Sequence, residues 1–144
     1  YTMPFQLICA PWIEADKFCN RMNGLNLKGV VFRPIHIKPY YSQSKGENIQ
    51  GVQLYITDVL DANLTMIQFH AMEILAEMYP DKRLLDENGQ GTLGNRWNMF
   101  DKVCGTSKIR LEFSKNYKVA DIIDYWNKDV DAFKEKSKKY YLYK

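Results

Sequence analysis

The chain has 144 residues, of which 46% are hydrophobic and 26% charged, and its formal net charge is +3. This length corresponds to about one domain, and the composition excludes a disordered or membrane-embedded protein. The last twelve residues hold five lysines and one glutamate. Such a lysine-rich segment suits the negative end of a helix dipole, so the charge does not indicate a nucleic-acid partner. We therefore expect one domain over residues 1–144.

The first third of the chain alternates strand-like and helix-like patterns. Residues 4–10 (PFQLICA) are short, apolar and partly β-branched, which predicts a buried strand that ends before Pro11. Apolar residues at helical spacing predict an amphipathic helix over residues 14–22, and the Asn23-Gly24 pair supplies its end.

Two further strands are expected on either side of a polar loop. Residues 30–38 are rich in β-branched side chains, but Pro34 and Pro39 would each remove a donor from the ladder, so this strand should be an edge or irregular one. Residues 52–57 form the second strand. The polar loop over residues 40–51 is long enough to carry a function rather than only a connection.

The second half of the chain is predicted to be helical. Asp61 can cap a helix over residues 62–78, which carries one continuous apolar stripe. Residues 81–95 contain three glycines and no periodicity, which predicts a surface loop. Short helices are expected over residues 97–104 and from Thr106 or Ser107 through Phe113. A last long helix over residues 119–139 should pack on the core, rather than form a coiled coil, through Val119, Ile123, Trp126, Val130 and Phe133.

This order of elements is that of an α/β (or α+β) protein: a small mixed sheet covered by helices, with a long C-terminal helix. No run of 18 apolar residues occurs, so no membrane span is expected. Cys9, Cys19 and Cys104 are odd in number and lack metal-ligand spacing, and no phosphate-loop or dinucleotide motif is present. We therefore expect no disulfide framework, no metal and no cofactor.

Two side chains of the 30–38 strand are candidates for ligand contact. Arg33 lies in a Phe-Arg-Pro sequence, and a guanidinium group suits bidentate carboxylate binding, although a structural salt bridge explains it equally well. His36 lies on the same strand face as Pro34 and Lys38. Because neither His36 nor His70 belongs to a metal or catalytic motif, a structural histidine is favoured over a catalytic base or a ligand.

The polar loop carries further candidates. Tyr41 stands between Tyr40 and Ser42, so this segment can stack on a ligand or hydrogen-bond to it. Glu47 follows Gly46 and offers a carboxylate, but glycosidases use a pair of carboxylates at a set separation. A turn is therefore the favoured role of the segment around Glu47.

A set of short motifs occurs in order along nearly the whole chain: Pro4-Phe5, Ala10-Pro11-Trp12, Phe32-Arg33-Pro34, Pro39, Gly46-Glu47, Gly51-Val52-Gln53, Thr57-Asp58, Phe100-Asp101, Gly105-Thr106 and Tyr141-Leu142-Tyr143. This set resembles the bacterial exo-β-N-acetylmuramidase family, formerly a domain of unknown function, whose members remove terminal N-acetylmuramic acid from peptidoglycan fragments. The resemblance covers only the C-terminal half of such proteins.

The resemblance implies a two-domain glycoside hydrolase in which a larger N-terminal Rossmann-like domain precedes a smaller α/β domain, with the active site in the cleft between them. The acid/base glutamate of that family belongs to the N-terminal domain, so the catalytic residue is expected outside this chain and the chain alone should be inactive. The substrate-binding residues implied for one wall of the cleft are Arg33, Tyr41, Glu47, Gln53 and His36.

The same resemblance suggests a ligand for Arg33, because the lactyl carboxylate of N-acetylmuramic acid would be a natural partner for a guanidinium group. It also has departures. Family members often carry a basic residue near Gln43 and a cysteine near Ile49, and this chain has neither.

Two functions therefore fit the sequence. The first is the C-terminal domain of an exported peptidoglycan hydrolase, whose parent would carry a signal peptide and act in the periplasm, in the cell envelope or outside the cell. The alternative is a non-catalytic carbohydrate-binding or interaction module. Because the chain begins at Tyr1 rather than Met, we expect a fragment or a processed chain.

Overall fold

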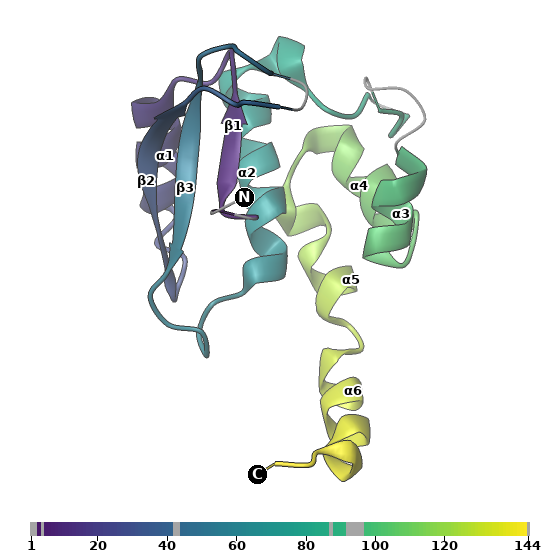
Figure 1. Cartoon of the computed structure of the whole chain (residues 1–144). Helices are drawn as coiled ribbons and strands as arrows, with labels where there is room; N and C mark the ends of the chain where they lie inside the picture. Colours follow the sequence, from purple (N-terminus) through teal and green to yellow (C-terminus); the bar gives the residue numbers. More distant parts are fainter. Residues whose placement is uncertain (1–2, 4, 42–43, 87, 92–96, 144) are drawn as a thin grey trace. The chain divides into compact units, whose positions relative to one another are not determined.

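The computed structural model describes residues 3, 5–41, 44–86, 88–91 and 97–143 (Figure 1). The chain forms two compact units, unit 1 (Tyr1–Met78) and unit 2 (Tyr79–Lys144). The single domain expected over the whole chain stays a prediction. No helix in the described part of the chain combines the length and the apolar character that a membrane crossing needs.

Unit 1 contains a three-stranded sheet with two helices in its described residues. The strands are β1 (Leu7–Ala10), β2 (Val30–Ile37) and β3 (Ile49–Ile56), and the helices are α1 (Ala15–Gly24) and α2 (Leu64–Met78). The strand order is β1-β3-β2, and both pairings are antiparallel. The predicted α/β class with a small helix-covered sheet is confirmed. The sheet is antiparallel rather than mixed, because β3 lies between β1 and β2 and pairs with both.

Both helices of unit 1 cover the same face of the sheet (Figure 1). β1 and β2 run in the same direction on either side of β3, and α1 is the crossover that connects them. Phe18 and Met22 of α1 are fully buried against this face, and each contributes about 1.5–3 kcal/mol by leaving water. The core also contains Val30 and Phe32 of β2, Val52 of β3, and Ile67, Ala71 and Ile74 of α2.

β2 is an edge strand, as its prolines predicted, and α1 protects its outer edge. The side-chain amide of Asn23 accepts the Phe32 N–H (2.9 Å) and donates to the Phe32 carbonyl (2.8 Å). Backbone groups alternate in direction along a strand, so Pro34 also points its nitrogen away from β3. The proline ring therefore removes no ladder bond, which is why the strand tolerates it.

Predicted boundaries of three elements in unit 1 are wrong: the strand expected over residues 4–10 is only Leu7–Ala10, and the ends of the loop before β3 and of α2 also differ. β3 begins at Ile49, so the polar loop is shorter than the 40–51 range that its composition indicated. Helix α2 begins at Leu64 rather than Ala62. Asp58, not Asp61, provides the carboxylate there: its Oδ1 accepts the N–H of Leu60 at 2.8 Å. The Ala62 N–H donates to the Asp58 carbonyl at 3.1 Å, so Ala62 closes this turn instead of beginning the helix.

Unit 2 is mainly helical in its described residues. Its elements are η1 (Pro80–Lys82), α3 (Trp97–Cys104), α4 (Lys108–Asn116), η2 (Val119–Asp121), α5 (Ile123–Asn127), α6 (Val130–Ser137) and η3 (Lys138–Tyr140). The bounds of α3 match the prediction. Part of the loop predicted over residues 81–95 lies outside the described residues, and its described part contains a bridge between Leu85 and Gly91.

A buried ion pair holds the α3 and α4 helices together. Arg110 donates from Nε and Nη2 to the two carboxylate oxygens of Asp101 at 2.7 and 2.8 Å. Its third donor, Nη1, reaches the Gly89 carbonyl at 2.6 Å, and the guanidinium lies 4.8 Å from the Trp97 ring centre. Arg110 is only 6% exposed. The Asp101 carboxylate raises the Arg110 pKa, which keeps the buried group charged.

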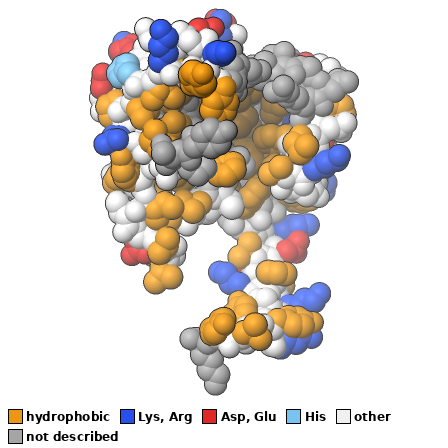
Figure 2. Space-filling model, viewed as in Figure 1, with side chains coloured by type: hydrophobic (Ala, Val, Ile, Leu, Met, Phe, Trp, Pro, Cys, Tyr) orange, Lys and Arg blue, Asp and Glu red, His pale blue; other side chains and the backbone are white. Residues whose placement is uncertain are grey.

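The long C-terminal helix is present from Ile123 to Tyr140, but a turn at residues 128–129 divides it into α5 and α6. The predicted buried face is correct at Val119, only partly buried at Ile123 and Trp126, and wrong at Val130 and Phe133. Val130 is 38% exposed and Phe133 is 68% exposed. Helical periodicity identifies residues that share a face, but it does not tell whether anything packs against that face. Figure 2 shows hydrophobic and basic side chains together on this segment.

Candidate functional site

The predicted residues Arg33 and Gln53 meet on the sheet face opposite to the one that α1 and α2 cover. They are direct partners in the register between β2 and β3, and Arg33 Nε donates to Gln53 Oε1 at 3.1 Å. The Tyr55 hydroxyl donates to the same oxygen at 3.0 Å, and Gln53 Nε2 donates to Gln6 Oε1 at 3.2 Å. Gln53 is only 5% exposed, so its amide is a fixed centre for the group.

This arrangement orients the Arg33 guanidinium and leaves its outer donors available. The Arg33 Cζ atom lies 4.9 Å from the centre of the Tyr55 ring, a cation–π distance. In the part of the chain that the structure describes, no acceptor takes the terminal nitrogens of Arg33. A guanidinium that is held by Nε and by stacking presents its remaining N–H groups as a fork for a carboxylate or phosphate.

The open sheet face around Arg33 is largely apolar. The two residues of a cross-strand pair lie side by side on the same face of the sheet, so the strand pairing identifies which residues share the face of Arg33. Figure 2 shows hydrophobic side chains gathered over the sheet. The apolar residues of this face that are partly or largely exposed are Leu7 and Cys9 of β1, Val31, Ile35 and Ile37 of β2, and Tyr55 of β3, whereas Ile49 of β3 is buried.

His36 does not join Arg33, because residues three apart on a strand lie on opposite faces. It pairs with Gln50 near the hairpin end, where His36, Lys38, Asn48 and Gln50 line a shallow pocket of about 440 Å³. The Gln50 side-chain oxygen accepts the N–H of Ala15 at 3.2 Å, which ties this end of the hairpin to α1. His36 itself is exposed.

Tyr41 and Glu47 lie on the loop that joins β2 to β3 and are both exposed. Gly46 has a φ of +79°, and its N–H donates to the Pro39 carbonyl at 2.9 Å. The Glu47 N–H donates to the Ser44 carbonyl at 3.1 Å, and this four-residue turn agrees with the turn role favoured for the segment around Glu47. The loop residues thus belong to the hairpin tip, whereas Arg33 and Gln53 lie towards the middle of the ladder.

The sequence reasoning missed Tyr55 and Gln6 as members of the Arg33 group. A signal for Tyr55 was available, because it stands two residues after Gln53 in a predicted strand and so shares its face. No comparable signal exists for Gln6. Its contact with Gln53 depends on β1 pairing with β3, across more than forty residues of sequence.

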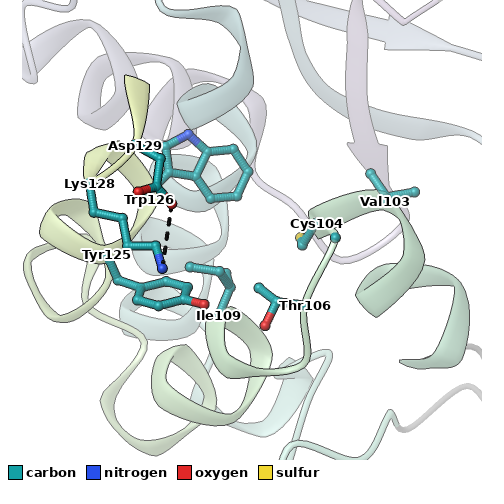
Figure 3. A pocket seen from close by; sticks show the side chains of 9 residues that line it. Val103, Cys104, Thr106, Ile109, Tyr125, Trp126, Lys128 and Asp129 are labelled. Carbon is teal, nitrogen blue, oxygen red and sulfur yellow. Dashed lines mark ion pairs between the residues drawn. The ribbon is translucent and has the colours of Figure 1, made fainter. Parts of the chain in front are cut away.

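Unit 2 contains a pocket of about 410 Å³ at the point where α3, α4 and α5 approach one another (Figure 3). Tyr125 and Trp126 of α5 line it, together with Thr106, Ile109 and Cys104. Burial raises the pKa of the Cys104 thiol, and the nearby Asp101 carboxylate acts in the same direction. The thiol therefore stays protonated at neutral pH and is a poor nucleophile.

The chain was compared with protein families and with known proteins. The model of the family described as "Exo-beta-N-acetylmuramidase NamZ, C-terminal" matches residues 1–143. The chain belongs to this family. The match confirms the resemblance that the sequence motifs carried, and it assigns the chain to the C-terminal part of the NamZ architecture.

Two relatives extend the match to the NamZ C-terminal family. The peptidoglycan β-N-acetylmuramidase NamZ of Bacillus subtilis (strain 168) is 30% identical over 142 residues, which cover 99% of this chain and 32% of that protein. The crystal structure of a DUF1343 family protein from Bacteroides fragilis NCTC 9343 is 46% identical, with a TM-score of 0.91 over all of this chain and 36% of that one. The chain spans about a third of the length of either relative.

Membership of the NamZ C-terminal family associates this fold with peptidoglycan hydrolases, a connection that the described side chains alone do not supply. Within the fold, the Arg33 group is the arrangement best suited to hold an anionic ligand. The substrate-binding roles of Arg33, His36, Tyr41, Glu47 and Gln53 stay predictions.

Proposed function

We propose that this chain is the C-terminal part of an exported exo-β-N-acetylmuramidase, which cleaves peptidoglycan fragments that end in N-acetylmuramic acid. The match of residues 1–143 to the NamZ C-terminal family carries the proposal. The enzyme acts in the periplasm, in the cell envelope or outside the cell. Its catalytic acid/base belongs to an N-terminal Rossmann-like domain that this chain does not include, and the chain alone is inactive.

In this proposal the open sheet face of unit 1 forms one wall of the substrate cleft. A three-stranded sheet with apolar residues on both faces calls for a neighbour on each. Helices α1 and α2 supply one neighbour. The N-terminal domain supplies the other, and substrate enters beside it.

Arg33 binds the lactyl carboxylate of N-acetylmuramic acid. This carboxylate distinguishes N-acetylmuramic acid from N-acetylglucosamine, so a guanidinium fork in the cleft gives specificity as well as affinity. Gln53 and Tyr55 act as positioning residues, because they hold Arg33 through Nε and through the ring. His36, Tyr41 and Glu47 contact parts of the substrate nearer the hairpin tip.

The proposal is tested with the longest natural polypeptide that contains this chain. Loss of charge-assisted hydrogen bonds worth about 1.5–3 kcal/mol should raise the KM of R33A for an N-acetylmuramic acid glycoside roughly 10- to 100-fold. R33K, which keeps the charge but loses the fork, should fall between wild type and R33A. A glycoside that lacks the lactyl group should show no such dependence on Arg33. An unchanged KM in a folded R33A protein would show the assignment to be wrong.

The alternative function, a non-catalytic carbohydrate-binding or interaction module, is favoured by one observation. Tyr40 and Tyr41 are both largely exposed on the hairpin loop, and Lys45 lies 5.8 Å from the Tyr40 ring centre. Exposed aromatic rings of this kind can contact sugars in non-catalytic binding modules as well as in enzyme clefts. A longer polypeptide that binds muropeptides but never cleaves them would select this function over the hydrolase.

A further inference from the structure

The pocket of unit 2 has the size and shape of a small-ligand site. Its volume of about 410 Å³ lies in the range of roughly 300–1,000 Å³ that such sites occupy. It is open to one side rather than enclosed, and its lining comes from three helices and from the turn at Gly105. Figure 3 shows the rings of Tyr125 and Trp126 along one side and Thr106 and Cys104 along the other.

The lining combines apolar surface with a few polar groups. Ile109, which is 2% exposed, forms the apolar floor, and the two aromatic rings form the wall. The Thr106 hydroxyl and the Asp129 carboxylate add oxygen atoms at the rim. A pyranose ring matches this pattern, because it presents C–H bonds on its faces to aromatic rings and hydroxyl groups on its edge to side-chain oxygens.

Two lysines lie over the Tyr125 ring: Lys128 lines the pocket, and Lys108 lies beside the pocket without lining it. The ammonium groups of Lys128 and Lys108 lie 4.6 and 5.2 Å from the centre of the Tyr125 ring. Lys128 is 3.5 Å from the highly exposed carboxylate of Asp129, a contact that water weakens. Lys108 has no ion-pair partner in the residues that the structure describes. Two lysines against one carboxylate leave a surplus of positive charge beside the aromatic wall.

The turn at Gly105 borders the pocket on open space. Gly105 has a φ of +71°, and a Cβ atom added there would meet nothing within 4 Å. The Thr106 hydroxyl oxygen accepts the N–H of Lys108 at 3.2 Å, which fixes the start of α4 beside the pocket. This bond fixes the Thr106 side of the pocket relative to α4.

We propose that this pocket binds one acidic amino sugar of the glycan strand, with the pyranose ring against Trp126 and its carboxylate at the Lys108 and Lys128 ammonium groups over the Tyr125 ring. This inference rests on the proposed function, because peptidoglycan is the source of such a sugar. The NamZ C-terminal fold then binds the glycan by two of its parts, the Arg33 group in unit 1 and this pocket in unit 2.

The test is a titration of the 144-residue chain, labelled with 15N, with N-acetylmuramic acid and with N-acetylglucosamine. The two probes differ only in the lactyl ether group on O3, which carries the carboxylate. We expect saturable shifts of the Trp126 indole N–H and of the Gly105 and Thr106 amides, with N-acetylmuramic acid bound about tenfold more tightly because of the charge-assisted contacts. Equal affinity for the two sugars, or no saturable shift at these three signals, would overturn the proposal.

Three variants sharpen the test. K108Q/K128Q, which changes exposed side chains only, should weaken N-acetylmuramic acid about tenfold to the level of N-acetylglucosamine. W126L should weaken both sugars, as read at the Gly105 and Thr106 amides. R33A, in the other unit, should leave the unit 2 shifts unchanged, so failure of the cleft proposal and failure of this one give different results. An acidic dipeptide such as alanyl-glutamate that shifts the pocket signals more strongly than the sugar would overturn the choice of ligand.

Discussion

The buried Arg110–Asp101 pair makes a quantitative prediction about stability. Replacing Asp101 by Asn keeps the shape of the side chain and removes its charge. The Arg110 side chain is 7% exposed, so the guanidinium would stay charged without its counter-ion. Loss of one partner of a buried pair costs about 3–5 kcal/mol. Because Asp101 is 17% exposed and the Gly89 carbonyl still accepts from Arg110, we expect D101N to cost about 3 kcal/mol.

The assay is equilibrium urea unfolding in a W12F background, in which fluorescence reports Trp97 and Trp126 of unit 2 alone. With a slope of about 1–3 kcal/mol per molar urea, a loss of about 3 kcal/mol lowers the midpoint by about 1–3 M. E112Q in the same helix is the matched control. Its pair with Lys115 is half exposed, so its effect should stay within about 0.5 kcal/mol.

A second substitution distinguishes an unpaired charge from a general loss of packing. R110M combined with D101L replaces both charges by apolar groups of similar size, and this double variant should be more stable than D101N. The reasoning is refuted if D101N unfolds at the same midpoint as E112Q, or if the double variant is less stable than D101N.

Three further predictions concern the described residues. G51A should prevent β1 from pairing with β3, because a Cβ atom there would lie 2.0 Å from a backbone oxygen of β1. G24A is the control, because a Cβ atom at Gly24 has free space and the substitution should be neutral. Circular dichroism and thermal unfolding compare the two variants. Y117F should cost about 1–3 kcal/mol in urea unfolding, because the buried hydroxyl both accepts from the Leu85 N–H and donates to its carbonyl. Burial lowers the His70 pKa, and the nearby Glu73 carboxylate opposes this effect, so the folded state binds the proton less readily than the unfolded state. The free energy of unfolding should therefore fall as the pH drops below about 6.5. H70N should make the melting temperature depend less on pH in this range.

Local patterns predicted the elements better than their partners. The prolines of β2 identified an edge strand because a missing N–H is a property of the residue itself. The Arg33–Gln53 contact depends on register across a hairpin whose loop is too long for a tight turn to fix it, so the sequence suggested both residues but not their pairing. Val130 and Phe133 have the spacing of a buried face, yet burial depends on a neighbour that periodicity does not reveal.

The candidate site shows the same division between local and long-range information. Arg33 was recognisable from its side chain and its neighbours alone. The pocket of unit 2 brings residues of α3 and α4 against Tyr125 and Trp126, about twenty positions later in the chain. Such a pocket exists only once the helices have packed, and no single stretch of sequence carries its signature.

Because the ladder between β2 and β3 is continuous, the position of Arg33 does not depend on the sequence of the hairpin loop. Eight consecutive residue pairs, from Val30 with Ile56 to Ile37 with Ile49, keep one register without a bulge. Arg33 is therefore placed by the strands, and the loop beyond Ile37 can lengthen, shorten or exchange its aromatic residues without moving the guanidinium. In evolutionary terms, proteins built on this hairpin can change the length and the aromatic content of the loop while keeping the Arg33–Gln53 pair in place.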